Sequence, residues 1–384
     1  MNIHINLSRD DHLFQPGSKR ILALDGGGLR GIVALAFLER IEHLLAESSG
    51  RGEAFRLCDH YDLIGGTSTG AVIASGLALG MPVAQLIDIY IRLSHEGFQG
   101  MRWHGGVWLP KFRTAPLLKV LRQYLAGVTL GSDQLRTGLA IIAKRLDTGS
   151  PWVFHNNPHG PYFDPDRALH PNAVPNKDFE LVDLIRASTA APTFFEPEVI
   201  DIGQGMKGTF VDGGTSPYNN PALILLLVAT VQGYGFGWPV GVGRLQLTSV
   251  GTGHKPLSFE AEKLAQQPGA LLGVQALLSL MGDCNWLTQA LLQWLSHCPT
   301  PWPIDREMGD LSQDQLGNGP FLHYLRYDVE LTAESLKTQL GVTLSVAEVE
   351  RLNQMDRPDL VERLLEIGRL AAERSVRVGD LGVV

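Results

Sequence analysis

The chain has 384 residues, of which 44% are apolar and 19% charged, and its 32 basic and 40 acidic residues give a net charge of −8. This composition excludes a disordered chain and argues against a protein that its bulk charge holds on a nucleic acid polymer. The three cysteines, Cys58, Cys284 and Cys298, fit neither a zinc site nor a disulfide framework. We therefore expect a reducing compartment.

The first 19 residues form a polar arm that contains charges and a Pro-Gly pair but no apolar stretch typical of a signal peptide. The longest apolar run, at 221–231, is shorter than a bilayer-spanning helix. The sequence thus predicts a cytoplasmic protein that, if it meets a membrane, does so from the water side.

Short apolar runs alternate with glycine turns and helical patterns along the first 250 residues. This alternation predicts an α/β fold with a mainly parallel sheet and helices on its faces. We expect strands at 20–24, 61–65, 139–145, 208–211 and 244–250. We expect helices at 32–46, 71–79, 82–94, 272–281, 345–353 and 360–373, and a helix or strand at 221–231. Ser345 and Glu348 form a capping-box signature.

A glycine-rich loop, Asp25-Gly26-Gly27-Gly28-Leu29-Arg30-Gly31, joins the first strand to its helix. Its backbone amides beside a helix N-terminus predict an anion site, although a plain glycine turn also fits. The loop satisfies the G-x-G-x-x-G pattern of dinucleotide sites, but the second strand ends in another glycine turn where a ribose-binding acid is expected. No Gly-Lys-Ser/Thr follows, which argues against an NTPase phosphate loop.

Ser68 lies in the segment Gly66-Thr67-Ser68-Thr69-Gly70, which matches G-x-S-x-G between an expected strand and an expected helix. That context is typical of a nucleophile elbow, where flanking glycines permit a sharp turn. A serine nucleophile needs a base. Three histidines lie downstream, but none is in a distinctive setting; they are His254, His297 and His323.

Asp212 ends the run Phe210-Val211-Asp212 and precedes Gly213 and Gly214. An aspartate there can point into a cleft at a sheet edge, although a simple Asp-Gly turn also fits. Taken together, a nucleophile, a base and an amide-lined loop are the three parts that acyl transfer requires.

In these three motifs the sequence resembles the patatin-like phospholipase family. Two further segments support the resemblance, Ala187–Pro192 and Ser249–Gly253, as does Asn219-Asn220-Pro221 after the Asp-Gly-Gly. The five ordered motifs cover about residues 19–254 and imply a three-layer catalytic domain at 20–255.

The resemblance implies a lipid acyl hydrolase that needs no metal or other cofactor and cleaves fatty-acyl esters of membrane phospholipids through an acyl-enzyme. It would contact the membrane peripherally, at its inner face. Ser68 would be the nucleophile and Asp212 its base. The amides of Gly26, Gly27 and Gly28 would form the oxyanion hole, with Arg30 nearby.

Residues 256–384 lie outside the motifs, and we expect a mainly helical extension that packs on the core, with a regulatory surface as the alternative. Some bacterial relatives are antiviral effectors switched on by a cyclic nucleotide. The segment 97–115, with Arg102 and Lys111 among tryptophans, could bind such an activator, or it could be a lipid-facing lid or ordinary packing. A constitutive lipase, a switched effector and a catalytically silent binding module therefore stay open, as does a homo-oligomer.

Overall fold

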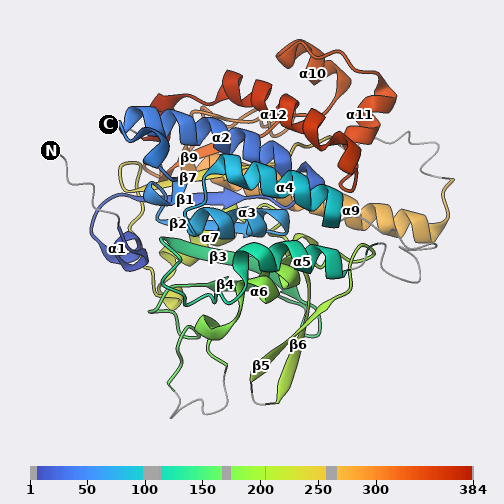
Figure 1. The fold of residues 1–384 in the computed structure, drawn as a ribbon. Coiled ribbons are helices and arrows are strands. Elements are labelled where there is room, and N and C mark those ends of the chain that lie inside the picture. The colour runs from blue at the N-terminus through green and yellow to red at the C-terminus, as the bar shows by residue number, and fades with distance from the viewer. Residues whose placement is uncertain are drawn as a thin grey trace.

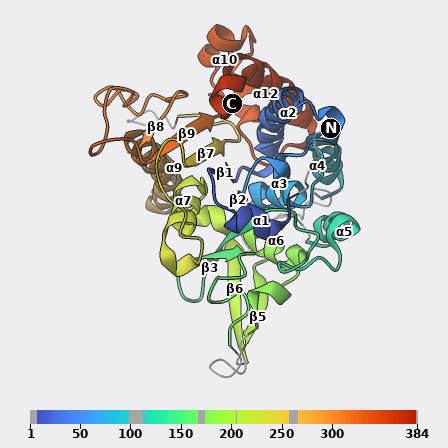
Figure 2. The same ribbon diagram turned by 90° about the vertical axis from the view of Figure 1, so that its left-hand side faces the viewer.

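The computed structural model describes residues 7–97, 112, 114–166, 174–203, 205–256 and 266–382. Most of the segment 97–115, including Arg102 and Lys111, lies outside these residues. Within them the chain forms one central sheet with helices on both faces (Figures 1 and 2). The predicted α/β class with a mainly parallel sheet is confirmed.

The sheet has the strand order β5-β6-β3-β2-β1-β7-β9-β8, with β4 also paired to β3. The strands in its centre are parallel, whereas β4, β5 and β6 run antiparallel to their neighbours. Their bounds are β1 Lys19–Leu24, β2 Leu63–Thr67, β3 Gly138–Arg145, β4 Ser150–His155, β5 Glu198–Gly203, β6 Met206–Asp212, β7 Leu245–Val250, β8 Ser296–His297 and β9 Leu322–Tyr327.

The helices of the described residues cover both faces of this sheet. Their bounds are α1 Arg9–Phe14, α2 Gly31–Ser48, α3 Thr69–Ala78, α4 Val83–Gly97, α5 Thr114–Leu125, α6 Leu181–Thr189, α7 Ala222–Thr230, α9 Gly269–Leu295, α10 Ala333–Leu340, α11 Val346–Leu352 and α12 Val361–Ser375. None of them is long and apolar enough to cross a bilayer.

Strand β1 shows how one sheet serves two apolar cores. Leu22 and Leu24 join the core under α2, α3, α4 and α12, whereas Ile21 and Ala23 join the core under α7. Successive side chains of a strand point to opposite faces, so a continuous apolar run is needed when both faces are covered. This explains why the run at 20–24 has no polar alternation.

Most sequence-based elements are confirmed with small shifts at their ends, but the helix expected at 272–281 continues to Leu295 as α9. Strand β2 begins two residues later than expected, and the run 221–231 is a helix, α7, rather than a strand. The capping box at Ser345 is present, with Ser345 Oγ accepting from the amide of Glu348. Part of the polar arm is helix α1, in which Leu13 is buried in the core under α7.

The chain beyond residue 256 contributes to the sheet and to its helical layer. Strand β9, which the sequence analysis did not predict, pairs with β7, and β8 pairs with β9. Helix α12 lies along α2 (Figure 1), where Gly368 allows close approach to Ala36 and Val33. This part of the chain therefore shares its core with the motif-bearing part.

The topology brings the sequence motifs to one edge of the sheet. Strands β1, β2, β7 and β9 are parallel, so the residues that follow them meet at a common edge. Strand β6 reaches this edge from the opposite direction. Its last residue, Asp212, pairs with Ala143 of β3, next to Ile142, which pairs with Thr67 of β2.

Candidate active site

Ser68 occupies a sharp turn between β2 and α3. Its backbone has φ 56° and ψ −124°, a conformation that L-residues rarely adopt. A side chain at Gly66 would collide with the carbonyl of Gly70, and one at Gly70 would collide with the carbonyl of Leu24. The two glycines are therefore required for the turn, which places Ser68 at the N-terminal, positive end of α3.

The hydroxyl of Ser68 faces the carboxylate of Asp212. Ser68 Oγ donates to Asp212 Oδ2 at 2.6 Å, and both side chains are buried. The other carboxylate oxygen, Oδ1, accepts from the amide of Gly214 at 2.7 Å, which fixes the orientation of the carboxylate. Burial raises the pKa of Asp212 to about 6, against the opposing effects of the hydrogen bonds from Ser68 and Gly214.

Ser188 holds the backbone of Ser68, a role that the sequence analysis did not assign. Its Oγ accepts from the amide of Ser68 at 2.8 Å and donates to the carbonyl of Ile142 at 2.6 Å. The amide of Asp212 donates to the carbonyl of Ala190. The segment Ala187–Pro192 thus contacts both Ser68 and Asp212. In the sequence, the feature that pointed to this segment was its match to a family motif.

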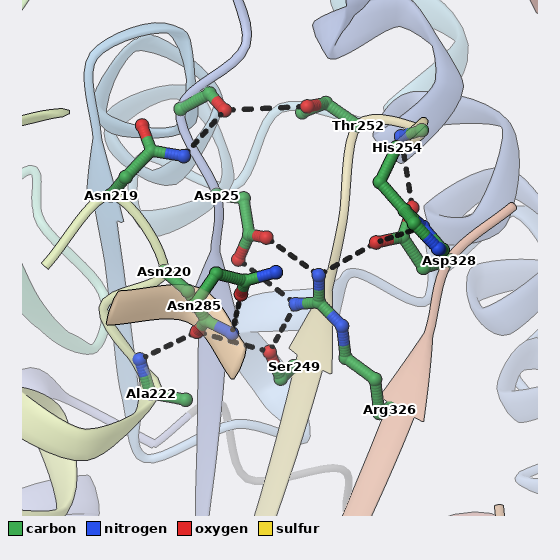
Figure 3. Close-up of polar contacts among 12 residues, drawn as sticks. Asp25, Asn219, Asn220, Ala222, Ser249, Thr252, His254, Asn285, Arg326 and Asp328 are labelled. Atoms are coloured by element: carbon green, nitrogen blue, oxygen red, sulfur yellow. Dashed lines mark hydrogen bonds and ion pairs between the residues drawn. The ribbon is translucent and has the colours of Figure 1, made fainter. Parts of the chain in front are cut away.

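The glycine-rich loop lies against the elbow, and its first peptide is held from two sides. The amide of Gly26 donates to the carbonyl of Asn219 at 3.0 Å. The carbonyl of Gly26 accepts from Asn219 Nδ2 at 3.2 Å and from Thr252 Oγ1 at 3.3 Å (Figure 3). A Cβ on Gly26 would lie 3.1 Å from Ser68 Cβ, so the loop backbone directly adjoins Ser68.

Within the described residues, the amides of Gly27 and Gly28 have no hydrogen-bond acceptor, whereas those of Gly26 and Leu29 do. The Leu29 amide donates to the carbonyl of Met355 at 2.8 Å. Gly28 has φ 58°, which favours glycine. Two adjacent free N–H groups in a loop that adjoins Ser68 at Gly26 are suited to an anionic oxygen.

Arg30, the remaining predicted residue of this loop, is partly buried, and its Nε has no hydrogen-bond partner among the described residues. Burial lowers the pKa of its guanidinium, and the negative charge of Asp328 partly offsets that effect. The guanidinium of Arg30 therefore interacts electrostatically with Asp328, a buried carboxylate that follows β9.

A buried ion cluster lies beneath the loop (Figure 3). Arg326 of β9 donates to Asp25 Oδ1 at 3.0 Å and Oδ2 at 2.7 Å, to Asp328 Oδ2 at 2.7 Å and to Ser249 Oγ at 2.7 Å. Burial raises the pKa of Asp25 to about 6, although Arg326 opposes this shift. Burial would also raise the pKa of Asp328, but the charge of Arg326 holds it well below its usual value.

None of the three downstream histidines is hydrogen-bonded to Ser68 or Asp212 in the described part of the chain. His254 is 3.5 Å from Asp328, and His297 and His323 contact each other at 3.2 Å on β8 and β9. In the described part of the chain, the one hydrogen bond made by the Ser68 hydroxyl goes to Asp212. The same part holds no group of three or more His, Cys, Asp or Glu side chains arranged for a metal ion.

Comparison with known proteins agrees with the motifs. The sequence profile of the patatin-like phospholipase family matches residues 22–226. A cGAMP-activated phospholipase of Vibrio cholerae is 30% identical over 291 residues, which cover 71% of this chain and 76% of the relative. The chain therefore belongs to the patatin-like phospholipase family.

Two further relatives match a shorter stretch. A cGAMP-activated phospholipase of Escherichia coli is 32% identical over 213 residues, 54% of this chain and 55% of the relative. Patatin-T5 of Solanum tuberosum is 31% identical over 218 residues, 55% of this chain and 53% of the relative. The chain thus spans about half the length of these two relatives.

Proposed function

We propose that the protein is a lipid acyl hydrolase that cleaves fatty-acyl esters of membrane phospholipids, with Ser68 as nucleophile and Asp212 as base. The observation that carries the proposal is the 2.6 Å hydrogen bond between Ser68 Oγ and Asp212 Oδ2 at a strained elbow. Membership of a phospholipase family supplies the substrate class.

In the proposed reaction, Ser68 Oγ attacks the ester carbonyl carbon while its proton passes to Asp212 Oδ2. The carbonyl oxygen becomes an oxyanion that the amides of Gly27 and Gly28 stabilise. Asp212 then gives the proton to the leaving alcohol oxygen, and an acyl-enzyme remains on Ser68. A water that transfers its proton to Asp212 attacks this ester, and the returning proton releases Ser68 and the fatty acid.

The environment of Asp212 suits a carboxylate to this work. An unperturbed aspartate has a pKa near 3.9 and accepts protons poorly. Burial raises the pKa of Asp212 to about 6, closer to neutral pH, where a general base is more effective. The hydrogen bond from Gly214 keeps Oδ2 directed at the Ser68 hydroxyl.

The test is fatty-acid release from phosphatidylcholine and phosphatidylglycerol vesicles by wild type, Ser68→Ala and Ser75→Ala, each with and without cGAMP. Ser75 is a matched control because it is a buried serine of α3, the helix that follows Ser68, and its hydroxyl donates to the carbonyl of Ala71. We expect hydrolysis by wild type and Ser75→Ala and none by Ser68→Ala. Hydrolysis by Ser68→Ala at the wild-type rate would exclude Ser68 as the nucleophile.

A catalytically silent binding module would give a different pattern. It would release no fatty acid under any condition, and Ser68 would not be labelled by a fluorophosphonate probe. We expect the probe to label wild type but not Ser68→Ala, because labelling requires the activated hydroxyl.

We further propose a cyclic-nucleotide activator, which would make the protein a switched, membrane-degrading effector. Two bacterial relatives named cGAMP-activated phospholipase support this proposal, one of them matched over 71% of this chain. We expect cGAMP to increase fatty-acid release by wild type and to raise the melting temperature of Ser68→Ala, since binding does not need the nucleophile. Equal activity with and without cGAMP, and with other cyclic dinucleotides, would indicate a constitutive lipase.

A further inference from the structure

We propose that Arg326 is a positioning residue for the oxyanion loop, which it holds through the carboxylate of Asp25. This inference rests on the proposed function, because it assigns Gly27 and Gly28 as the oxyanion donors. It places a residue of the last third of the chain in the machinery of an active site whose motifs all lie before residue 254.

Arg326 contacts the loop at its first residue. Asp25 directly precedes the three glycines, and both of its carboxylate oxygens accept from the guanidinium, at 3.0 and 2.7 Å. A two-pronged contact of this kind fixes orientation as well as distance. The amide of Asp25 donates to the carbonyl of Val250, so the backbone is fixed at the same point.

A second connection runs from Arg326 through Asp328. Asp328 Oδ2 accepts from Arg326, and Asp328 Oδ1 accepts from the amide of Gly253 at 2.9 Å. Thr252, the neighbour of Gly253, donates to the carbonyl of Gly26, and its side chain lies where a Cβ on Gly27 would stand. Figure 3 shows Arg326 between Asp25 and Asp328 in this arrangement. Two series of contacts therefore connect the Arg326 guanidinium to the glycine loop, one through Asp25 and one through Asp328.

The far end of the loop is also held from beyond residue 256. The carbonyl of Met355, between α11 and α12, accepts from the amide of Leu29. A Cβ on Gly28 would lie 2.6 Å from that carbonyl oxygen. The free amides of Gly27 and Gly28 thus lie between two fixed points, Asp25 and Leu29, both secured by the last third of the chain.

Stability alone is a weak reason for this cluster. Buried charges lose their hydration, and apolar replacements of buried ion pairs are often neutral or stabilising. In the described residues, the only hydrogen bonds to the Asp25 carboxylate come from Arg326, so loss of the guanidinium leaves a buried acid directly before the oxyanion loop. A role in positioning the oxyanion loop would explain why an ion cluster with a high desolvation cost lies directly before that loop.

The test compares Arg326→Lys, Asp25→Asn, the double variant and Arg136→Lys with wild type, in the full chain with and without cGAMP. A lysine keeps the charge but loses the two-pronged contact. Arg136→Lys is the control, because Arg136 also pairs with a largely buried aspartate, Asp59, but at the opposite edge of the sheet.

We expect Arg326→Lys and Asp25→Asn each to lower kcat by roughly 10- to 100-fold with KM changed by less than about threefold, since a lost oxyanion donor costs about 10²–10³ in rate. The double variant should lose about as much as the worse single variant, because both act through one contact. Arg136→Lys should retain wild-type kcat.

Four results would overturn the inference. A folded Arg326→Lys or Asp25→Asn with wild-type kcat would exclude positioning, as would a loss of activity proportional to the unfolded fraction in thermal melts. Additive losses in the double variant would show that Arg326 does not act through Asp25. If wild type itself releases no fatty acid, or does so equally as Ser68→Ala, the proposed function fails and this inference fails with it.

Discussion

The residues before 256 and those after it contribute to the same site in different ways. The first part carries the groups that would touch substrate, Ser68, Asp212 and the amides of Gly27 and Gly28. The second part carries none of these, yet β9 supplies Arg326 and the segment after α11 supplies the carbonyl of Met355. The groups that would touch substrate lie in short sequence motifs, whereas the residues that hold them in place come from distant points of the chain.

This difference reflects how the two kinds of residue are specified. A nucleophile elbow is a local structure, because its strand, glycines and helix are consecutive in the chain. A support such as Arg326 acts across 301 positions of sequence and depends on the pairing of β7 with β9. Changes in the first part should therefore lower the rate and leave folding intact. Substitutions after residue 256 should lower the free energy of unfolding. The exceptions are residues that contact the glycine-rich loop, where substitutions should lower the rate.

Removal of the proposed base should have the largest effect. We expect Asp212→Asn to lower fatty-acid release by about 10²–10⁴-fold, because the amide fills the same space but cannot accept the proton. Asp201→Asn is the control, since Asp201 Oδ1 accepts from the amide of Gly203 as Asp212 Oδ1 does from Gly214. Substantial activity in Asp212→Asn would instead require another base, such as a histidine.

The pKa of Asp212 gives a second prediction for the same residue. Burial raises this pKa to about 6, so kcat/KM should rise with pH through about 6 and then level off. Because the folded state then binds more protons than the unfolded state between about pH 4 and 6, Asp212 should favour folding as pH falls through this range. Activity and this contribution to stability should therefore change in opposite directions. A pH–rate profile together with melts of Asp212→Asn and wild type measures both.

Gly28→Ala tests the contact between the two parts of the chain. The new Cβ would lie 2.6 Å from the carbonyl oxygen of Met355, and the backbone has φ 58°. We expect a fall in kcat of roughly 10- to 100-fold as the loop moves. Gly50→Ala has a similar φ of 67° with open space around it, so it should cost only the backbone strain. Equal activity of the two variants would show that contact with Met355 is unimportant.

A smaller effect is expected where α12 packs on α2. In Gly368→Val, the first added carbon would lie 2.7 Å from the Cβ of Ala36, so the helices must separate. Overpacking of this kind costs about 1–3 kcal/mol in the free energy of unfolding. Chemical denaturation measures the loss, and Gly282→Ala in α9, with open space around it, is the control. An unchanged midpoint would mean that α12 does not depend on this contact.

The smallest effect is expected at the N-terminus of α11. Ser345→Ala removes the hydroxyl that caps the amide of Glu348 and should cost about 1 kcal/mol. Because Ser345 is exposed and its printed hydrogen bonds are to Glu348 of its own helix, kcat of the folded protein should not change. A lower kcat without a lower melting temperature would show that α11 is coupled to the loop through Met355.

The sequence by itself predicted the mainly parallel α/β core and singled out the G-x-S-x-G turn at Ser68, the glycine loop and the Asp-Gly-Gly at Asp212, whose role as base came from the family resemblance. These features depend on local patterns, in which apolar runs, glycines and polar residues follow one another within a few positions. The same patterns placed β1, β2, β3, β6 and β7 to within a few residues.

Only the tertiary structure decided which groups support the site. Ser188 contacts the amide of Ser68 across 120 positions, and Arg326 contacts Asp25 across 301. The structure also showed that the amide of Gly26 is already occupied by Asn219, which leaves Gly27 and Gly28 as the free donors. Such choices depend on sheet order and register, which bring distant residues within hydrogen-bond distance and leave no periodic signal in the chain.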